Sequence, residues 1–222
     1  MELIENLMKD IAIFGAGGFG REVACLINRI NRQQPDSWNF IGFFDDDEKI
    51  WGAWNDYGKV LGGIDVLNSW DTPLNMIIAI GNVAVLELID GRINNPNVIY
   101  PNLIDPNVEF MDPDRVEMGH GNVICMRSTI STNVKLGNFN ILNTAVGVGH
   151  DVIIGHYNVF MPSTNLSGGV VMGDCNFLGV QSVVLQYVKI GKQTRIGANS
   201  VVIRNTKDGF LYIGNPAKRT VL

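Results

Sequence analysis

The chain has 222 residues and a formal net charge of −5, and its length suits one large or two modest domains. Its hydrophobic content of 46% is ample for packed cores, and the negative charge argues against a nucleic-acid-binding protein, which usually has a basic face. Cys25, Cys125 and Cys175 are widely spaced. We therefore expect a reducing compartment, and neither a disulfide framework nor a zinc site.

The first residues, MELIENLMKD, include acidic side chains and contain no long apolar run. We therefore expect no signal peptide. No later segment has the length and apolar character of a membrane span. Together these features predict a cytoplasmic protein.

The first hundred residues alternate between short apolar runs and helical patterns. The expected strands are residues 10–15, 39–44, 75–80 and 97–100, and the expected helices are 19–30 and 83–93. This alternation predicts a small parallel sheet of the Rossmann type. The segment is too short for the second half of a dinucleotide fold, so it suits a single nucleotide better than a nicotinamide dinucleotide.

A glycine-rich turn joins the first expected strand to the first expected helix. Gly15, Gly17 and Gly20 form a GxGxxG pattern there, with Gly18 at one of its variable positions. This pattern lets a phosphate approach the helix N-terminus. A tight turn with no ligand explains the same pattern, so this alternative stays open.

Polar and glycine residues follow two other expected strands. The run Asp45-Asp46-Asp47 follows one strand, and Gly81 follows another. Ligands of open α/β sheets lie at the carboxyl ends of strands, so these residues and Gly15 predict a binding cleft. A solvated turn also explains the aspartates.

The second half has an unbroken period of six. Apolar residues recur every six positions from Met118 to Val202, and glycine follows them at an overlying period of eighteen. Only a β-helix of hexapeptide repeats explains this spacing, with eighteen residues closing one coil. We divide the chain into a nucleotide-binding domain (1–103), a β-helix domain (104–204) and a turn-rich, basic tail (205–222).

The chain has three histidines, and one of them has a distinctive neighbourhood. His120 and His156 occupy turn or outward positions that suit exposed polar side chains. His150 precedes Asp151, and at a corner of the coil the two side chains can meet, so that the carboxylate orients the imidazole and supports its positive form. Gly168 lies eighteen residues later, beside His150 on the next coil. Its N–H can donate to an oxyanion, although a need for glycine in the turn explains it equally.

Seven motifs carry a resemblance to a known family. They are IAIFGAGGFGRE (11–22), IGFFDDD (41–47), AIGN (79–82), GHDVIIG (149–155), GVVMGDCNFLG (169–179), IGANSVV (196–202) and GNPAKR (214–219). With them the chain resembles the hexapeptide-repeat sugar acetyltransferases with an N-terminal nucleotide-binding domain. These include nucleotide-4-amino-sugar N-acetyltransferases of glycan biosynthesis and the so-called sialic acid O-acetyltransferase proteins.

The resemblance implies a left-handed parallel β-helix, a homotrimer and acetyl-CoA bound between neighbouring β-helices. It implies that His150 is the general base, Asp151 its acidic partner and Gly168 the amide facing the thioester carbonyl and the acetyl-CoA. It places Lys218 near the CoA phosphates.

For the sugar nucleotide, the resemblance implies contacts with the N-terminal domain. Gly15, Gly17 and Gly18 would lie near the sugar or phosphates. Asp45 and Asp46 would lie near the nucleoside, and Gly81 would flank it.

Two positions depart from the family pattern. Relatives often have a second histidine nine residues after the base, where this chain has Val159, and a polar, Arg-containing helix where it has Val83-Ala84-Val85-Leu86. We expect acetyl transfer from acetyl-CoA to a nucleotide-linked amino sugar, without a metal. The alternatives are O-acetylation of a sugar hydroxyl and a nucleotide-binding trimer with an inert β-helix; a nicotinamide oxidoreductase is the weakest.

Overall fold

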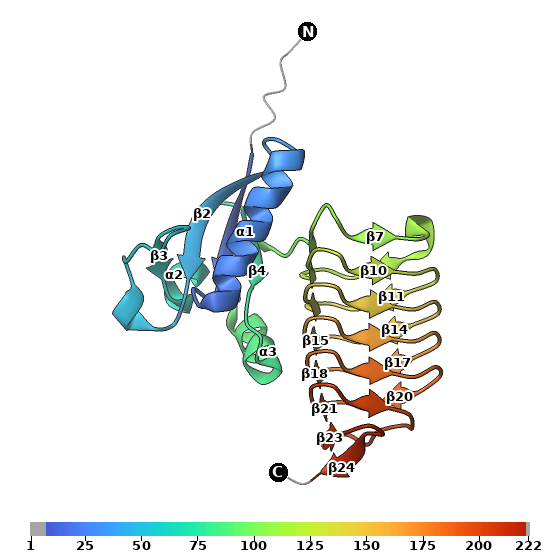
Figure 1. Ribbon diagram of the computed structural model, residues 1–222. Coiled ribbons are helices and arrows are strands. Elements are labelled where there is room, and N and C mark those ends of the chain that lie inside the picture. Colours follow the sequence, from blue (N-terminus) through green and yellow to red (C-terminus); the bar gives the residue numbers. More distant parts are fainter. Residues whose placement is uncertain (1–7, 221–222) are drawn as a thin grey trace.

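The structure, a computed structural model, describes residues 8–220 and contains an α/β unit followed by a long β-helix (Figure 1). The α/β unit contains a five-stranded parallel sheet of order β3-β2-β1-β4-β5. Its strands are β1 (Lys9–Phe14), β2 (Trp38–Phe44), β3 (Val60–Gly62), β4 (Leu74–Ile78) and β5 (Val98–Ile99). Its helices are α1 (Gly18–Gln33), α2 (Ile64–Asn68) and α3 (Val83–Arg92), with a short 3-10 helix, η1 (Glu48–Ile50).

The expected strands and helices of this unit are present, with every end within three residues of the expected position. The strand β3 and the helix α2 were not expected from the sequence. Both are short, with three and five residues, and carry too few apolar positions to show a period.

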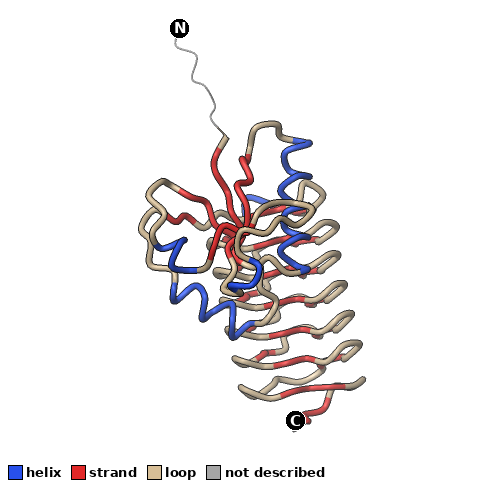
Figure 2. The backbone as a smooth tube through the Cα atoms, turned by 90° about the vertical axis from the view of Figure 1, so that its left-hand side faces the viewer, coloured by secondary structure: helices blue, strands red, loops and turns tan. Residues whose placement is uncertain are grey.

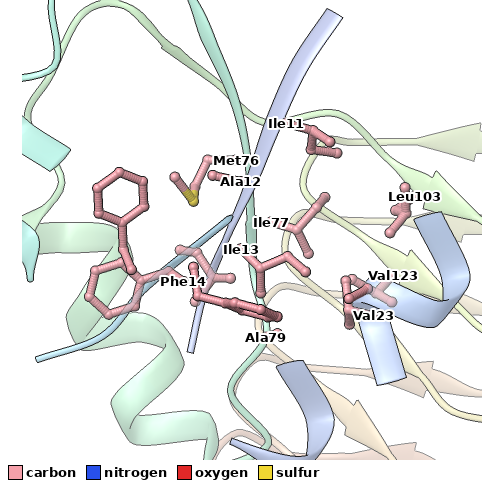
Figure 3. Close-up of a cluster of buried hydrophobic side chains, with 14 of the residues drawn as sticks. Ile11, Ala12, Ile13, Phe14, Val23, Met76, Ile77, Ala79, Leu103 and Val123 are labelled. Atoms are coloured by element: carbon pink, nitrogen blue, oxygen red, sulfur yellow. The ribbon is translucent and has the colours of Figure 1, made fainter. Parts of the chain in front are cut away.

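The core of the α/β unit forms because β1 is apolar on both faces. Ile11, Ala12 and Ile13 are fully buried between neighbouring strands and the helices. The buried residues of α1 include Val23 and Ile27, spaced four apart on one helical face. Figure 3 shows the side chains of β1 packed with Val23 of α1, and includes two residues of the β-helix, Leu103 and Val123.

The β-helix is left-handed and has three parallel faces. Face 1 contains β6 (Leu103–Ile104), β9 (Val123–Ile124), β12 (Ile141–Leu142), β15 (Val159–Phe160), β18 (Phe177–Leu178) and β21 (Arg195–Ile196), extended by β23 (Leu211–Ile213) and the antiparallel β24 (Lys218–Thr220). Face 2 contains β7 (Glu109–Phe110), β10 (Thr129–Ile130), β13 (Gly147–Val148), β16 (Asn165–Leu166), β19 (Val183–Val184) and β22 (Val201–Val202). Face 3 contains β8 (Glu117–Met118), β11 (Lys135–Leu136), β14 (Ile153–Ile154), β17 (Val171–Met172) and β20 (Lys189–Ile190). A 3-10 helix, η2 (Pro113–Arg115), joins β7 to β8.

The structure confirms the inward register predicted from the period of six. The repeat residues from Ile124 to Val202 are all buried, and Met118 at the first coil is half-buried. Strand partners lie eighteen residues apart, as in Gly147 opposite Asn165. The coils therefore stack in the regular column seen edge-on in Figure 2.

Each corner of the β-helix turns through a residue in the left-handed region. These residues recur every six positions and include Asp151 (φ 58°) and Tyr157 (φ 56°), with glycine at Gly121 and Gly169. The amide of such a residue donates to the preceding coil, as from Asp151 to the Thr132 carbonyl at 3.1 Å. These hydrogen bonds offset the backbone strain of a non-glycine residue at positive φ.

A column of buried asparagines stabilises one corner. Asn122, Asn140, Asn158 and Asn176 lie eighteen residues apart and are fully buried. The Asn158 Oδ1 accepts from both the backbone N and the Nδ2 of Asn176, each at 2.9 Å. Because one oxygen satisfies two buried donors, each member of the column joins two coils.

Face 1 of the β-helix meets the α/β unit. Arg29 of α1 forms an ion pair at 2.6 Å with Asp105, which is 2% exposed. The Tyr157 hydroxyl donates to Asp90 of α3 at 2.6 Å. These contacts and the shared apolar cluster fix the α/β unit against one side of the column.

We predict that Asn158→Ala lowers the free energy of unfolding by about 1–3 kcal/mol, because it leaves the buried backbone N–H of Asn176 without its acceptor. Urea denaturation measures this loss. The matched control is Asn165→Ala, whose side chain is exposed and whose loss should cost less than about 1 kcal/mol. Equal midpoints for Asn158→Ala and the wild type would contradict the role of the column.

Candidate active site

His150 and Asp151 lie in the turn that joins β13 of face 2 to β14 of face 3. The left-handed conformation of Asp151 brings two adjacent side chains to the same side, which a straight strand does not allow. The His150 Nδ1 lies 2.8 Å from the Asp151 Oδ2, and both side chains are about half exposed. The pair predicted from sequence is therefore formed, with the imidazole Nε2 on the opposite side of the ring from the carboxylate.

The carboxylate of Asp151 is held by a second residue. The Asn133 Nδ2, one coil earlier, donates to the Asp151 Oδ1 at 3.1 Å. The hydrogen bond from His150 and then that from Asn133 hold the pKa of the Asp151 carboxyl below its usual range. The acidic partner is therefore ionised at neutral pH. Asn133 was not singled out from the sequence, although its spacing of eighteen from Asp151 is the signal that identifies it.

Gly168 lies directly beside His150 on the next coil. A Cβ added at Gly168 would collide with the imidazole Nε2, so no other residue fits while the ring keeps this position. Gly168 is buried under the ring, and its N–H has no acceptor within residues 8–220. The neighbouring Gly169 amide donates to the His150 carbonyl at 2.8 Å. The turn therefore combines an imidazole, a carboxylate and an unpaired backbone donor.

The other two histidines have different surroundings. The His156 Nδ1 accepts from the backbone N of Asn138 at 3.0 Å. The His120 ring stacks near Tyr100, with ring centroids 6.2 Å apart. Both residues are exposed, as expected.

The glycine-rich turn contains two kinds of glycine. Gly15 has φ +108°, and a Cβ at Gly20 would overlap the Gly15 carbonyl, so these two are required by the turn. Gly17 and Gly18, at the start of α1, and Gly81, after β4, face open space. Packing therefore does not require glycine at these three positions. Without side chains there, the backbone at the carboxyl ends of the strands is accessible to a ligand.

Asp45 and Asp46 are both held by the chain. The Asp45 Oδ2 accepts from the Ala16 backbone N at 2.8 Å, which ties the end of β2 to the glycine-rich turn. Asp46 accepts from the Ile64 backbone N at 3.1 Å and pairs with Arg92 at 2.6 Å. Arg92 was not singled out from the sequence, because it lies 46 residues from its partner on another element.

The remaining expected site residue, Lys218, lies on β24 at the far end of face 1 and is exposed. Three coils separate β13 from β22, the last strand of face 2, so the rise from His150 to the last coil is about 14 Å. Lys218 is therefore placed apart from the pair.

The two candidate regions face different directions. The α/β unit contacts face 1, whereas the turns that join face 2 to face 3 lie on the opposite side of the column (Figure 1). Within one chain, the glycine-rich edge and the His150 pair are therefore separated by the body of the β-helix.

Comparison with a family model identifies the N-terminal segment. Residues 10–89 match the model of the PglD N-terminal domain. No curated protein sequence matches the chain.

Comparison with solved structures covers nearly the whole chain. WeeI from Acinetobacter baumannii AYE is 28% identical with a TM-score of 0.85, and the match covers 96% of this chain and 100% of that chain. The acetyltransferase domain of PglB from Neisseria gonorrhoeae FA1090, in complex with acetyl coenzyme A, is 26% identical with a TM-score of 0.84, covering 96% and 99%. PerB from Caulobacter crescentus, in complex with CoA and GDP-perosamine, is 26% identical with a TM-score of 0.81, covering 96% and 98%.

These similarities confirm the family resemblance and the fold expected from the motifs. Of the helices that the structure describes, none combines the length and the apolar character needed to cross a membrane.

We predict that Asn133→Ala raises the pKa of the Asp151 carboxyl, because it removes one of the two side-chain hydrogen bonds that hold this pKa below its usual range. NMR titration of the Asp151 carboxyl resonance in the variant and the wild type measures the shift. An unchanged Asp151 pKa would show that Asn133 does not stabilise the carboxylate.

Proposed function

We propose that this chain, a hexapeptide-repeat acetyltransferase with an N-terminal domain of the PglD type, transfers the acetyl group of acetyl-CoA to the amine of a nucleotide-linked sugar. The observation that carries the proposal is the His150–Asp151 pair, 2.8 Å apart and beside the unpaired amide of Gly168. An imidazole base and an oxyanion donor are the two groups that aminolysis of a thioester needs. The similar proteins whose structures contain acetyl coenzyme A, or CoA and GDP-perosamine, support the same reaction.

His150 acts as the general base. Asp151 accepts a hydrogen bond from Nδ1, which fixes the tautomer and leaves the lone pair of Nε2 to take a proton from the amine. The amine nitrogen bonds to the thioester carbon, the N–H of Gly168 stabilises the oxyanion, and the C–S bond then breaks. The proton passes from His150 to the departing sulfur, so the products are the amide and free CoA.

The magnitudes are consistent with this division of roles. A general base contributes about 10²–10⁴-fold and one oxyanion donor about 10²–10³-fold. Holding the two substrates together supplies the remainder.

The nucleotide of the acceptor binds at the carboxyl ends of β1, β2 and β4. Gly17, Gly18 and the free amides of α1 suit its phosphates, and Gly81 leaves the opposite wall open. Gly15 shapes this turn. Asp45 and Asp46 keep lone pairs for the ribose hydroxyls in addition to the hydrogen bonds that they accept from the chain.

The separation of the two regions supports a site shared between neighbouring chains, which the family resemblance implies are those of a homotrimer. A sugar bound to the α/β unit lies on the face 1 side of its own β-helix, whereas the turns that join face 2 to face 3 lie on the opposite side (Figure 1), and His150 belongs to one of these turns. Because the sugar cannot reach His150 of its own chain, the His150 turn of a neighbouring chain lies against the sugar. In that arrangement acetyl-CoA lies between two β-helices, with its phosphates toward Lys218. We place the reaction in the cytoplasm, in the biosynthesis of a surface glycan.

We predict that the wild type releases free thiol from acetyl-CoA with one member of a panel of UDP-, dTDP- and GDP-linked amino sugars. His150→Ala should lower kcat about 10²–10⁴-fold, and His120→Ala, which changes another exposed histidine of the β-helix, should leave it nearly unchanged. Release equal in His150→Ala and wild type would reject His150 as base. Release only with hydroxyl acceptors would indicate O-acetylation, and nucleotide binding without any release would indicate an inert trimer.

We also predict that kcat/KM falls as the pH is lowered from about 8 to 5, the range in which an imidazole gains its proton. A protonated ring has no lone pair with which to accept the proton of the amine. The measurement is initial thiol release in buffers of constant ionic strength. A flat profile across this range would contradict a histidine base.

A further inference from the structure

The strand order determines where each part of a nucleotide can lie along the carboxyl edge of the sheet. The order is β3-β2-β1-β4-β5, so β2 and then β3 lie on one side of the glycine-rich turn that follows β1. Phosphates suit the start of α1, and in sheets of this kind the ribose hydroxyls bind an acidic residue after the second strand. With phosphates at Gly17 and ribose at Asp45, the base lies farther along the edge, toward the end of β3.

Trp51 occupies that part of the edge. Its indole Nε1 donates to the Asp45 carbonyl at 2.7 Å. Its ring lies against Gly63, the residue after β3, where an added Cβ would come within 2.7 Å of the ring. One hydrogen bond and one close contact therefore hold the indole across the ends of β2 and β3. Trp51 nevertheless remains 43% exposed.

The charges around Trp51 suit an uncharged ring. The carboxylates of Asp45, Asp46 and Asp47 lie at the end of β2, and Glu48 begins η1. Arg92 pairs with Asp46, and Lys49 of η1 adds a second positive charge, but the four carboxylates outnumber these two cations and the edge repels phosphate. A neutral nucleobase meets no such repulsion, so the acidic side of the edge selects the orientation in which the base, and not the diphosphate, lies against the indole.

We propose that Trp51 is the surface on which the nucleobase of the bound nucleotide stacks. The inference rests on the nucleotide-linked acceptor of the proposed function and adds the residue that positions its base. An indole face accepts purines and pyrimidines alike, and base–aromatic stacking contributes substantially to affinity. Trp51 therefore holds the nucleoside in place while the sugar extends past Gly81 toward the acetyl donor.

Tryptophan fluorescence tests the contact directly. UDP, dTDP and GDP are titrated into wild type, Trp51→Phe and Trp54→Phe, the last being a matched control because Trp54 is 76% exposed on the same loop. We expect the nucleotide that binds to quench the tryptophan fluorescence of the wild type and of Trp54→Phe. In Trp51→Phe most of this quenching should be absent. Trp51→Phe retains an aromatic plane, so its fold and its binding should persist. Unchanged quenching in Trp51→Phe would overturn the proposal.

Calorimetry of Trp51→Leu and Trp54→Leu measures the contribution to binding. Loss of one stacked base corresponds to roughly 5–150-fold weaker nucleotide binding, which we expect for Trp51→Leu alone, with an unchanged KM for acetyl-CoA. Equal nucleotide affinity in Trp51→Leu and wild type would overturn the stacking while leaving the acetyl transfer intact, as would an equal rise in both substrates' KM values. A wild type that binds none of the three nucleotides would overturn both this inference and the acceptor class.

Discussion

The structure depends on a turn that the chain repeats at every sixth residue of the β-helix. At each of these positions the backbone enters the left-handed region, mostly without glycine, and at all of them except Asn133 the amide donates to the preceding coil. This conformation costs an L-residue about 1–2 kcal/mol. The stacked hydrogen bonds and the inward apolar residue of each hexapeptide offset that cost only while the register of six is kept. An insertion loop within the repeats would interrupt both contributions at once.

The same turn creates the chemistry of the His150 pair. Two adjacent side chains meet only because Asp151 is the left-handed residue of its corner, and the next coil brings Gly168 beside the ring. The site is therefore made by residues at corresponding positions of successive coils. The stacking of the coils alone positions these residues, and no other helix or strand is needed to do so.

The sequence was sufficient for the features that depend on periodicity. The inward register of the β-helix, the face of each repeat and the neighbours of His150 at a spacing of eighteen all follow from one regular rule. The α/β unit has no such rule beyond its strand–helix alternation, and its short elements β3 and α2 were missed. The pairing of Asp46 with Arg92 and the position of Trp51 against Gly63 depend on how distant elements pack, and no local pattern encodes this. The domain limits at 103 and 204, and the roles assigned to the site residues, stay predictions.

The coil also sets a scale of length along the molecule. Each eighteen residues between the His150 turn and the basic tail add one rise of about 4.8 Å, so in the proposed arrangement the length available to acetyl-CoA changes by whole coils. Adding or removing one complete coil would change that length without altering any face. Adding a single hexapeptide would keep every apolar residue inward yet rotate the tail by one face, away from the column of His150. A lineage of such proteins can thus change the length of its donor site only in steps of eighteen residues.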